Sequence, residues 1–159
     1  MTDNEPKSLP AKTELTAEQR RNKYNRAVRE ARLVTIDLRG VKFSADPAAP
    51  LARGDKTRRG FGSEIVEFQY DPDEKIVFSC IRWKINLKDG RKNIVSCQVD
   101  YSVLYDGFSS TEEEIVKLFV EYVARPATYA YFRALYAQLD WSAGLNSPPL
   151  PVVQFTPKV

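Results

Sequence analysis

The sequence predicts an α+β fold in which a long C-terminal helix packs against a four-stranded antiparallel sheet. Segments that alternate between apolar and polar residues fill positions 32–108, as expected for strands. Turn sequences, DPDE at 71–74 and DG at 89–90, interrupt them. Helical periodicity occurs on both sides, and strands grouped apart from helices are typical of a sheet covered by a helix layer. We expect one domain at 16–159 after a disordered tail at 1–15.

The first helix is predicted from Thr16 to about Ala31. Thr16 is a favoured N-cap residue, and Glu18 and Gln19 lie in the first turn. Basic side chains cover most of this helix and its apolar stripe is narrow, so we expect it at the periphery of the fold. Such a basic face is usually only solvated, and nucleic-acid binding through it is the less favoured reading.

The first strand changes phase in the middle. Its apolar residues at 34–38 and at 41–43 alternate in opposite phase, and a bulge or kink at Gly40 would bring both sets to one face. Residues 46–60 predict a long loop, and RRGFG at 58–62 is interpreted as a flexible basic part of it. Alternation then predicts a half-buried second strand with its apolar residues at Val66, Phe68 and Tyr70.

The third and fourth strands form a predicted hairpin around DG at 89–90. A two-residue turn there would place Cys80 opposite Val99, and Ile85 opposite Ile94 on the other face. The apolar side of the sheet would then switch between the base and the tip of the hairpin, unless a bulge near Cys80 cancels the switch. In this register Cys80 and Cys97 share a face as small buried residues, with a redox pair as a minor alternative.

Two helices follow the sheet. Thr111 and Glu114 fit a capping box for a short helix, which Arg125-Pro126 is expected to end. The long helix is predicted from Thr128 to about Ser142, with Gly144 ending it. Prolines at 148, 149 and 151 then predict an extended return.

The long helix is apolar nearly all round. One predicted face holds Tyr129, Phe132, Leu135, Tyr136, Leu139 and Ala143. The opposite face holds Tyr131, Ala134, Gln138 and Trp141. A helix of this kind must be covered on two sides. We expect its own sheet on one side and a second subunit or a ligand on the other.

The composition argues against most catalytic and membrane functions. The 159 residues carry a net charge of +3 and include no histidine, the commonest general base and zinc ligand. No apolar run approaches the roughly 20 residues of a membrane span, and no signal peptide is predicted. The acidic groups at 71–74 and 112–114 are better explained as a turn and a helix start. We therefore predict no catalytic residue, metal or cofactor, and the two cysteines suggest a reducing cytoplasm.

Residues 32–155 contain, in this order, the segments RLVTIDLRGVKFSADP, DYSVLYDG, TEEEIVKLFVEY, YAYFRALYAQL and PPLPVVQF. These segments and their order resemble the SecB family of export chaperones. The resemblance implies an ATP-independent holdase that forms a dimer of dimers through its long helices and binds extended clients in apolar grooves. Export members are acidic and dock the translocase motor SecA on acidic sheet residues, whereas this chain is basic. It also stops before the family's second helix. Other SecB-like proteins are chaperones of antitoxins.

These observations predict a bacterial, cytoplasmic holdase for unfolded polypeptides, for export or for a dedicated partner such as an antitoxin. The client groove is predicted to be lined by Trp83, Ile85, Tyr131, Tyr136, Leu145 and Leu150. The contact within a homotetramer is predicted at Tyr129, Ala134, Gln138 and Trp141. The sequence does not separate groove residues from subunit-contact residues, because both kinds of surface use aromatic side chains. The alternatives are an oligomeric binding module for a small apolar ligand and a weak nucleic-acid binder.

Overall fold

The computed structural model describes residues 15–49, 57–109, 112–153 and 155, and it confirms the predicted α+β class. The elements in chain order are α1 (Ala17–Glu30), β1 (Arg32–Ala45), β2 (Thr57–Asp71), β3 (Ile76–Asp89), β4 (Lys92–Asp106), α2 (Glu113–Phe119), the π-helical turn η2 (Val120–Ala124) and α3 (Arg125–Ser142). Residues 1–14 of the predicted tail lie outside the described part of the chain.

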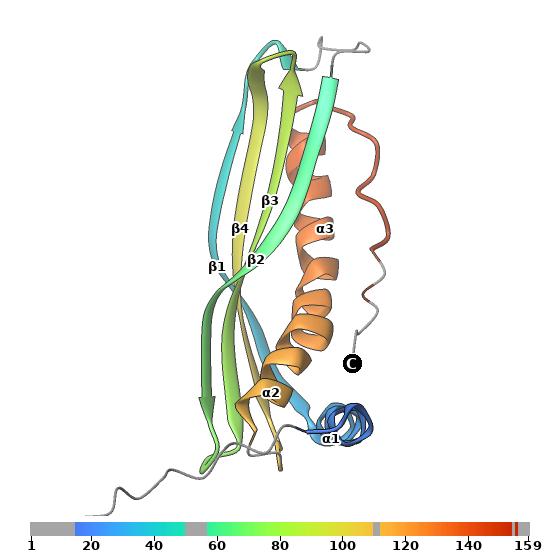
Figure 1. Ribbon diagram of the computed structural model, residues 1–159. Coiled ribbons are helices and arrows are strands. Elements are labelled where there is room, and N and C mark those ends of the chain that lie inside the picture. Colours follow the sequence, from blue (N-terminus) through green and yellow to red (C-terminus); the bar gives the residue numbers. More distant parts are fainter. Residues whose placement is uncertain (1–14, 50–56, 110–111, 154, 156–159) are drawn as a thin grey trace, which may run out of the picture.

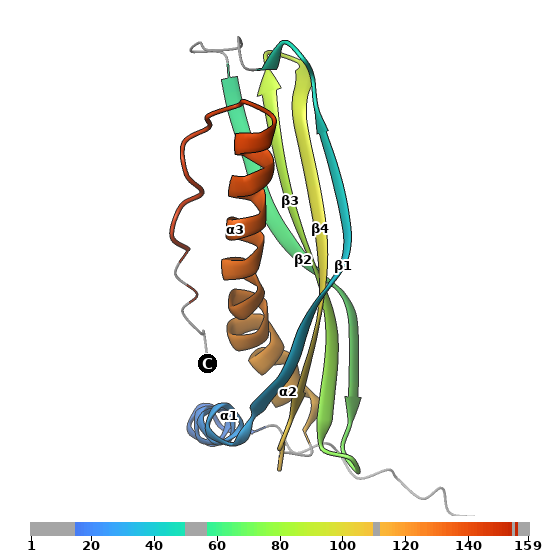
Figure 2. The ribbon, with the colours of Figure 1, turned by 180° about the vertical axis from the view of Figure 1, so that it is seen from behind.

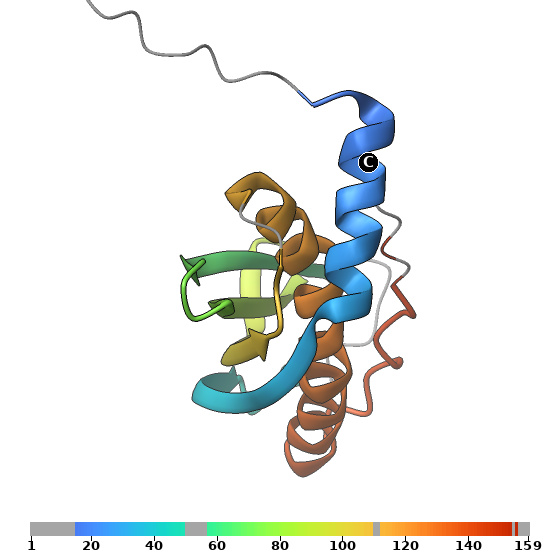
Figure 3. The same ribbon diagram turned by 90° about the horizontal axis from the view of Figure 1, so that it is seen from below.

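The strands form one long, twisted antiparallel sheet in the order β1-β4-β3-β2. Helix α3 runs along one face of this sheet, and the opposite face carries no helix (Figures 1 and 2). We call these the inner face and the outer face. Helix α1 lies at one end of the sheet beside α2, and the C-terminal segment runs back along α3 on the side away from the sheet (Figures 1 and 3).

The hairpin register differs from the predicted one. Asp89 pairs with Lys92, so the turn is at residues 90–91, and a register shift follows between Leu87 and Lys88. As a result, β3 is shifted by an odd number of residues relative to β4 compared with the predicted pairing. Such a shift turns every side chain of a strand to the opposite face of the sheet. Trp83 therefore pairs with Val99, and the inner face carries apolar side chains at both its base and its tip, with Ser63 and Ser79 among them. The predicted switch of the apolar side is wrong.

The cysteines also lie differently from the prediction. Cys80 pairs with Ser102 on the outer face, whereas Cys97 pairs with Ile85 on the inner face. The two thiols are on opposite sides of the sheet, so they cannot form a disulfide in this fold. Both cysteines are free.

Both edge strands contain bulges. In β1 the register shifts between Leu38 and Gly40, which keeps Ile36 and Val41 on the inner face, as predicted. A second shift lies between Leu33 and Thr35, and Val34 at that shift is 53% exposed, so its predicted inward position is wrong. In β2 a shift between Ile65 and Glu67 leaves Val66 40% exposed, so its predicted inward position is wrong. Residues 57–62 belong to β2 rather than to the predicted loop, because they pair with β3.

The short and long helices form one rod instead of being separated by a break. Pro126 is the second residue of α3, and the five residues before Arg125 form the π-helical turn η2. A proline lacks an N–H and crowds the carbonyl four residues earlier, and a π-helical turn relieves that crowding without ending the helix. Glu112 is the N-cap of α2 and makes no side-chain capping bond, while Thr111 lies outside the described residues.

Helix α3 ends at Gly144, as predicted. Gly144 has φ +66°, its N–H donates to the Trp141 carbonyl, and the Leu145 N–H donates to the Asp140 carbonyl. These two bonds form a Schellman motif, which satisfies the last helix carbonyls. Leu145 then packs in a small second cluster with Val95.

Helix α1 is peripheral, and its predicted cap is confirmed. Thr16 and Gln19 form a capping box. The buried residues of α1 are Tyr24 and Ala27. Both belong to the main hydrophobic core, and the ion pairs of Arg20 with Glu114 and of Lys23 with Glu112 lie beside this contact.

Gly107 marks the point where the chain after β4 meets the end of α1. It has φ +87°, and a Cβ there would lie 2.6 Å from the Glu30 carbonyl oxygen. Alanine in this conformation costs about 1–2 kcal/mol before any clash is counted. We expect Gly107→Ala to lower the free energy of unfolding by about 2 kcal/mol or more, measured by urea titration. Gly62→Ala is the control, since a Cβ there meets nothing within 4 Å, and an equal loss in both variants would contradict this account.

Candidate functional site

Trp83 and Ile85, predicted to line a groove, lie in the core beneath α3. Each is 1% exposed. The Trp83 ring stacks on Phe61 and on Phe132, with ring centroids 5.6 Å apart in each pair. Its Nε1 donates to the Thr128 hydroxyl at 2.9 Å. A groove-lining role for these two residues does not agree with this burial, and the cause is the mispredicted hairpin register.

The outward face of α3 is uncovered in this chain. Trp141 is 77% exposed and Tyr131 52% exposed, and Ala134 and Gln138 between them are exposed too. Tyr129 does not belong to this face. It is 7% exposed and its hydroxyl donates to the Pro151 carbonyl at 2.5 Å. The predicted division of α3 into a sheet-facing side and an opposite apolar side is therefore present, with Tyr129 on the sheet-facing side.

Residues 145–153 form an extended segment beside α3, which we call the return segment. Arg59 of β2 donates to the carbonyl of Pro148 at 2.6 Å and to that of Pro149 at 3.4 Å. Asp140 accepts the Ser147 N–H at 2.9 Å. Together with the Tyr129 bond, these contacts hold the segment largely through its main chain. At the predicted groove position Leu150, the side chain is only 3% exposed and joins the main core.

A hollow of about 340 Å³, the α3 hollow, lies between α3 and the return segment. Tyr136, Trp141 and Leu150 all line it, so the structure brings together three of the predicted site residues. Tyr136 is 4% exposed and forms the inner part, whereas Trp141 is open to solvent. The hollow thus has an aromatic wall and an adjoining stretch of extended chain.

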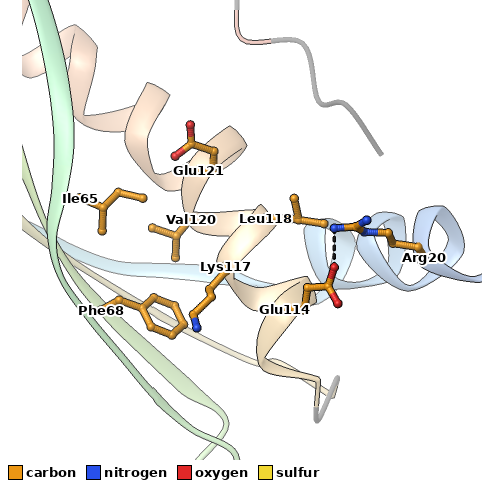
Figure 4. A pocket seen from close by; sticks show the side chains of 8 residues that line it. All are labelled: Arg20, Ile65, Phe68, Glu114, Lys117, Leu118, Val120 and Glu121. Atoms are coloured by element: carbon orange, nitrogen blue, oxygen red, sulfur yellow. Dashed lines mark ion pairs between the residues drawn. The ribbon is translucent and has the colours of Figure 1, made fainter. Parts of the chain in front are cut away.

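A second hollow, of about 390 Å³, lies where α1, α2 and β2 meet, and we call it the α2 hollow (Figure 4). Ile65 and Phe68 from β2 line one side, and Leu118 and Val120 line the other. Its surface is almost entirely apolar. Sequence reasoning missed this site: the apolar alternation in β2 was visible, but no local pattern indicated that α1 would close it.

Charged side chains surround the α2 hollow. Arg20 of α1 pairs with Glu114 of α2 at 2.5 Å, as Figure 4 shows. The Lys117 ammonium lies 5.5 Å from the centre of the Phe68 ring, a cation–π contact. The rim is therefore of mixed sign, and it can meet polar groups beside an apolar segment without favouring one charge.

The basic residues of α1 are mostly engaged within the fold. The ion pairs are Arg20 with Glu114, Lys23 with Glu112 and Arg26 with Glu30. Pairing reduces the positive charge that this helix offers to a phosphate backbone. Nucleic-acid binding through α1 is weakened accordingly.

The described residues offer little for catalysis. They contain no group of three or more metal-ligating side chains. None of the helices in this part of the chain is long and apolar enough to cross a membrane. Burial raises the pKa of the Cys97 thiol to about 11, and burial is also the main cause of the raised pKa of Cys80. Neither thiol is activated as a nucleophile.

The sheet order and the helix along its inner face define a SecB-like α+β fold. No protein-family model and no curated protein matches the chain. Among solved structures, the SecB-like chaperone of Mycobacterium tuberculosis, in complex with a ChAD peptide from the HigA1 antitoxin, matches with a TM-score of 0.68 and 16% identity over 84% of this chain and 97% of that chain. This likeness confirms the predicted fold.

A protein of unknown function from Streptococcus agalactiae also matches, with a TM-score of 0.39 and 10% identity. It covers 78% of this chain and 97% of that chain. At this TM-score the match carries no structural argument.

The thiols provide a direct check of the hairpin register. A pKa of about 11 leaves about 0.1% of Cys97 as thiolate at pH 8. We expect Ellman's reagent to modify Cys80 on the outer face at least about ten-fold faster than buried Cys97 in the native protein. The Cys80→Ser protein should show only the slow reaction, and rapid modification of that variant would contradict the observed register.

Proposed function

We propose that this chain is an ATP-independent chaperone that holds unfolded or aggregation-prone polypeptides. The solved relative of the same fold is a chaperone bound to a peptide, which supports a polypeptide ligand and a non-catalytic role. No metal-ligating group of three or more side chains occurs among the described residues.

The return segment is the observation that carries the proposal. The chain holds its own extended, proline-rich return segment beside α3. Arg59 and Tyr129 donate hydrogen bonds to three main-chain carbonyls of this segment, those of Pro148, Pro149 and Pro151. Carbonyl groups are common to every polypeptide, so this mode of binding does not depend on a particular sequence. A side-chain socket, filled here by Leu150, adds apolar burial.

The two hollows extend this surface. The α3 hollow adjoins the return segment, and the α2 hollow supplies further apolar lining at the other end of the helical rod. Aromatic and aliphatic walls bind any exposed apolar segment because removal of apolar area from water needs no directional contact. We therefore revise the proposed groove. Tyr131, Tyr136 and Leu150 stay in it, and Trp141 moves to it from the predicted subunit contact because it lines the α3 hollow. Phe68 and Leu118 join them, while Trp83, Ile85 and Leu145 support the groove from the core.

The outward face of α3 fits a subunit contact. Besides Ala134, it includes Ala127 and Ala130, and small residues let two helices approach closely. We propose that this face forms the contact in a homo-oligomer, and that Gln138 rather than Tyr129 lies within it. The tetrameric state and the bacterial cytoplasm remain predictions.

A dedicated partner such as an antitoxin fits better than export. The solved relative binds a segment of an antitoxin. The alternative of a small apolar ligand rests on the apolar lining of the two hollows. Competition distinguishes the two functions: unfolded protein displaces an apolar dye from a holdase, and lipids displace it from a small-ligand site.

Trp141→Ala tests the binding surface. At 77% exposure the change should leave stability within about 0.5 kcal/mol. We expect it to weaken binding of a fluorescently labelled, chemically unfolded client about ten-fold, because Trp141 supplies the open aromatic wall of the α3 hollow.

The wild-type protein should also suppress the light scattering that the aggregating client produces, without ATP and at about one oligomer per client.

The matched control is Val28→Ala, which removes exposed apolar area on α1 away from both hollows. It should bind the client as the wild type does. Failure of the folded wild type to suppress aggregation of general clients, and to bind any peptide from an antitoxin, would refute the chaperone proposal.

The subunit contact has a separate test. We expect the wild-type protein to elute at a multiple of the 18.1 kDa chain in size-exclusion chromatography with light scattering. Ala134→Arg places a charge in the proposed contact and should lower that mass without loss of helical circular dichroism. A wild-type protein that is monomeric at about 50 µM would contradict the contact, since a stable interface persists at such concentrations.

A further inference from the structure

The outer face of the sheet carries basic residues around a flat polar row near the β3–β4 turn. Three successive rows cross the strands there. The first row is Lys42, Gln98, Lys84 and Gly62. The second is Ser44, Ser96, Asn86 and Gly60. The third contains Lys88 and Arg58. We call these rows the basic face.

The spacing of the rows suits an extended chain. Residues two apart on one strand face are about 6.6 Å apart, so the two basic rows lie about 13 Å apart with the polar row between them. Gly60 and Gly62 have no side chain that could project above the sheet at these positions. A Cβ at Gly60 would meet only the Asn86 carbonyl at 4.0 Å, and one at Gly62 would meet nothing within 4 Å. Packing therefore does not require glycine at either position, and their absence of a side chain leaves room for a partner's main chain.

Several of these cations have no counterion among the residues that the structure describes. Lys42, Arg58 and Lys88 are exposed, and none of them forms an ion pair with any residue in the described ranges. Lys84 differs, because it binds Glu64 at 2.6 Å. The positive charge of this end is thus available to a ligand from at least three strands.

The pKa of a neighbouring carboxyl reflects the same field. Asp100 lies in the next row of the outer face, and the hydrogen bond from Arg82 is the main cause of its lowered pKa. The charges of Lys42 and Lys84 lower it further. Both lysines therefore act across the sheet surface at the position of Asp100.

The other half of the outer face carries acidic residues together with two arginines. Its carboxylates are Asp37, Glu67, Asp71 and Asp106, and Arg39 and Arg32 pair with Asp37 and Asp106. A long polyanion that followed the sheet would meet these carboxylates and be repelled. The basic rows also hold no aromatic side chain for base stacking, which single-stranded nucleic acids use on sheet surfaces. A short anionic segment matches this confined charge better than a nucleic acid does.

We propose that the basic face docks a short acidic segment of a partner polypeptide. The segment lies across the strands over the polar row, and its carboxylates pair with Lys42, Arg58 and Lys88. The basic face is on the opposite side of the sheet from α3, so it can be occupied while the client surface is also occupied. The proposal does not depend on the chaperone function.

Binding of a fluorescein-labelled peptide of about eight glutamates, followed by anisotropy at about 20 mM salt, tests the proposal. The double variant Lys42→Glu/Lys88→Glu should weaken binding at least ten-fold, and about 150 mM salt should weaken wild-type binding several-fold. The control Arg21→Glu/Arg29→Glu makes the same change in net charge on exposed residues of α1 and should stay within about two-fold of the wild type.

A second variant separates shape from charge. Gly60→Gln adds a neutral side chain to the polar row, and its open surroundings predict an unchanged melting temperature. It should weaken peptide binding about five-fold. The proposal is overturned by no wild-type binding up to about 1 mM peptide, by equal losses in the two double variants, or by tighter, Lys42- and Lys88-dependent binding of an oligothymidylate of about 20 nucleotides. That last result would assign the face to nucleic acid.

Discussion

Trp83 fixes the position of α3 on the sheet, because a buried indole N–H needs a hydrogen-bond acceptor and Thr128 at the start of α3 provides it. The Thr128 hydroxyl in turn donates to the Arg125 carbonyl, so the bond is built into the first turn of the helix. Sliding or rotating α3 by one residue would break both this bond and the stacking on Phe132. The outward face of the helix and the course of the return segment follow from this single placement.

The parts of the fold with a local signal were predictable. The cap at Thr16, the bulge near Gly40, the end of α3 at Gly144 and the two-sided character of α3 each depend on residue type and spacing. The hairpin register was not predictable in this way. DG at 89–90 is compatible with a turn at either of two positions, and a bulge beyond it costs little, yet one residue of slip reverses both faces.

That reversal explains the errors in the candidate site. Trp83 and Ile85 were assigned to a surface because the predicted register turned them away from the core. Tyr131 and Trp141 needed no register, since helical periodicity alone places them opposite the sheet, and they are exposed. The α2 hollow depends on the pairing of Arg20 with Glu114, residues far apart in the chain. A local sequence pattern does not reveal contacts between residues far apart in the chain, so only the structure could identify the α2 hollow.

The π-helical turn η2 determines the rotational phase between the two ends of the helical rod. Each residue of an α-helix turns it by about 100°. Removing one residue from Val120–Ala124 to restore regular winding would therefore rotate α3 by about that angle relative to α2. Phe132 would then leave the sheet, and Trp141 would point toward a different neighbour. An irregularity of one turn near Pro126 thus sets, some fifteen residues away, which side chains the protein presents to its surroundings.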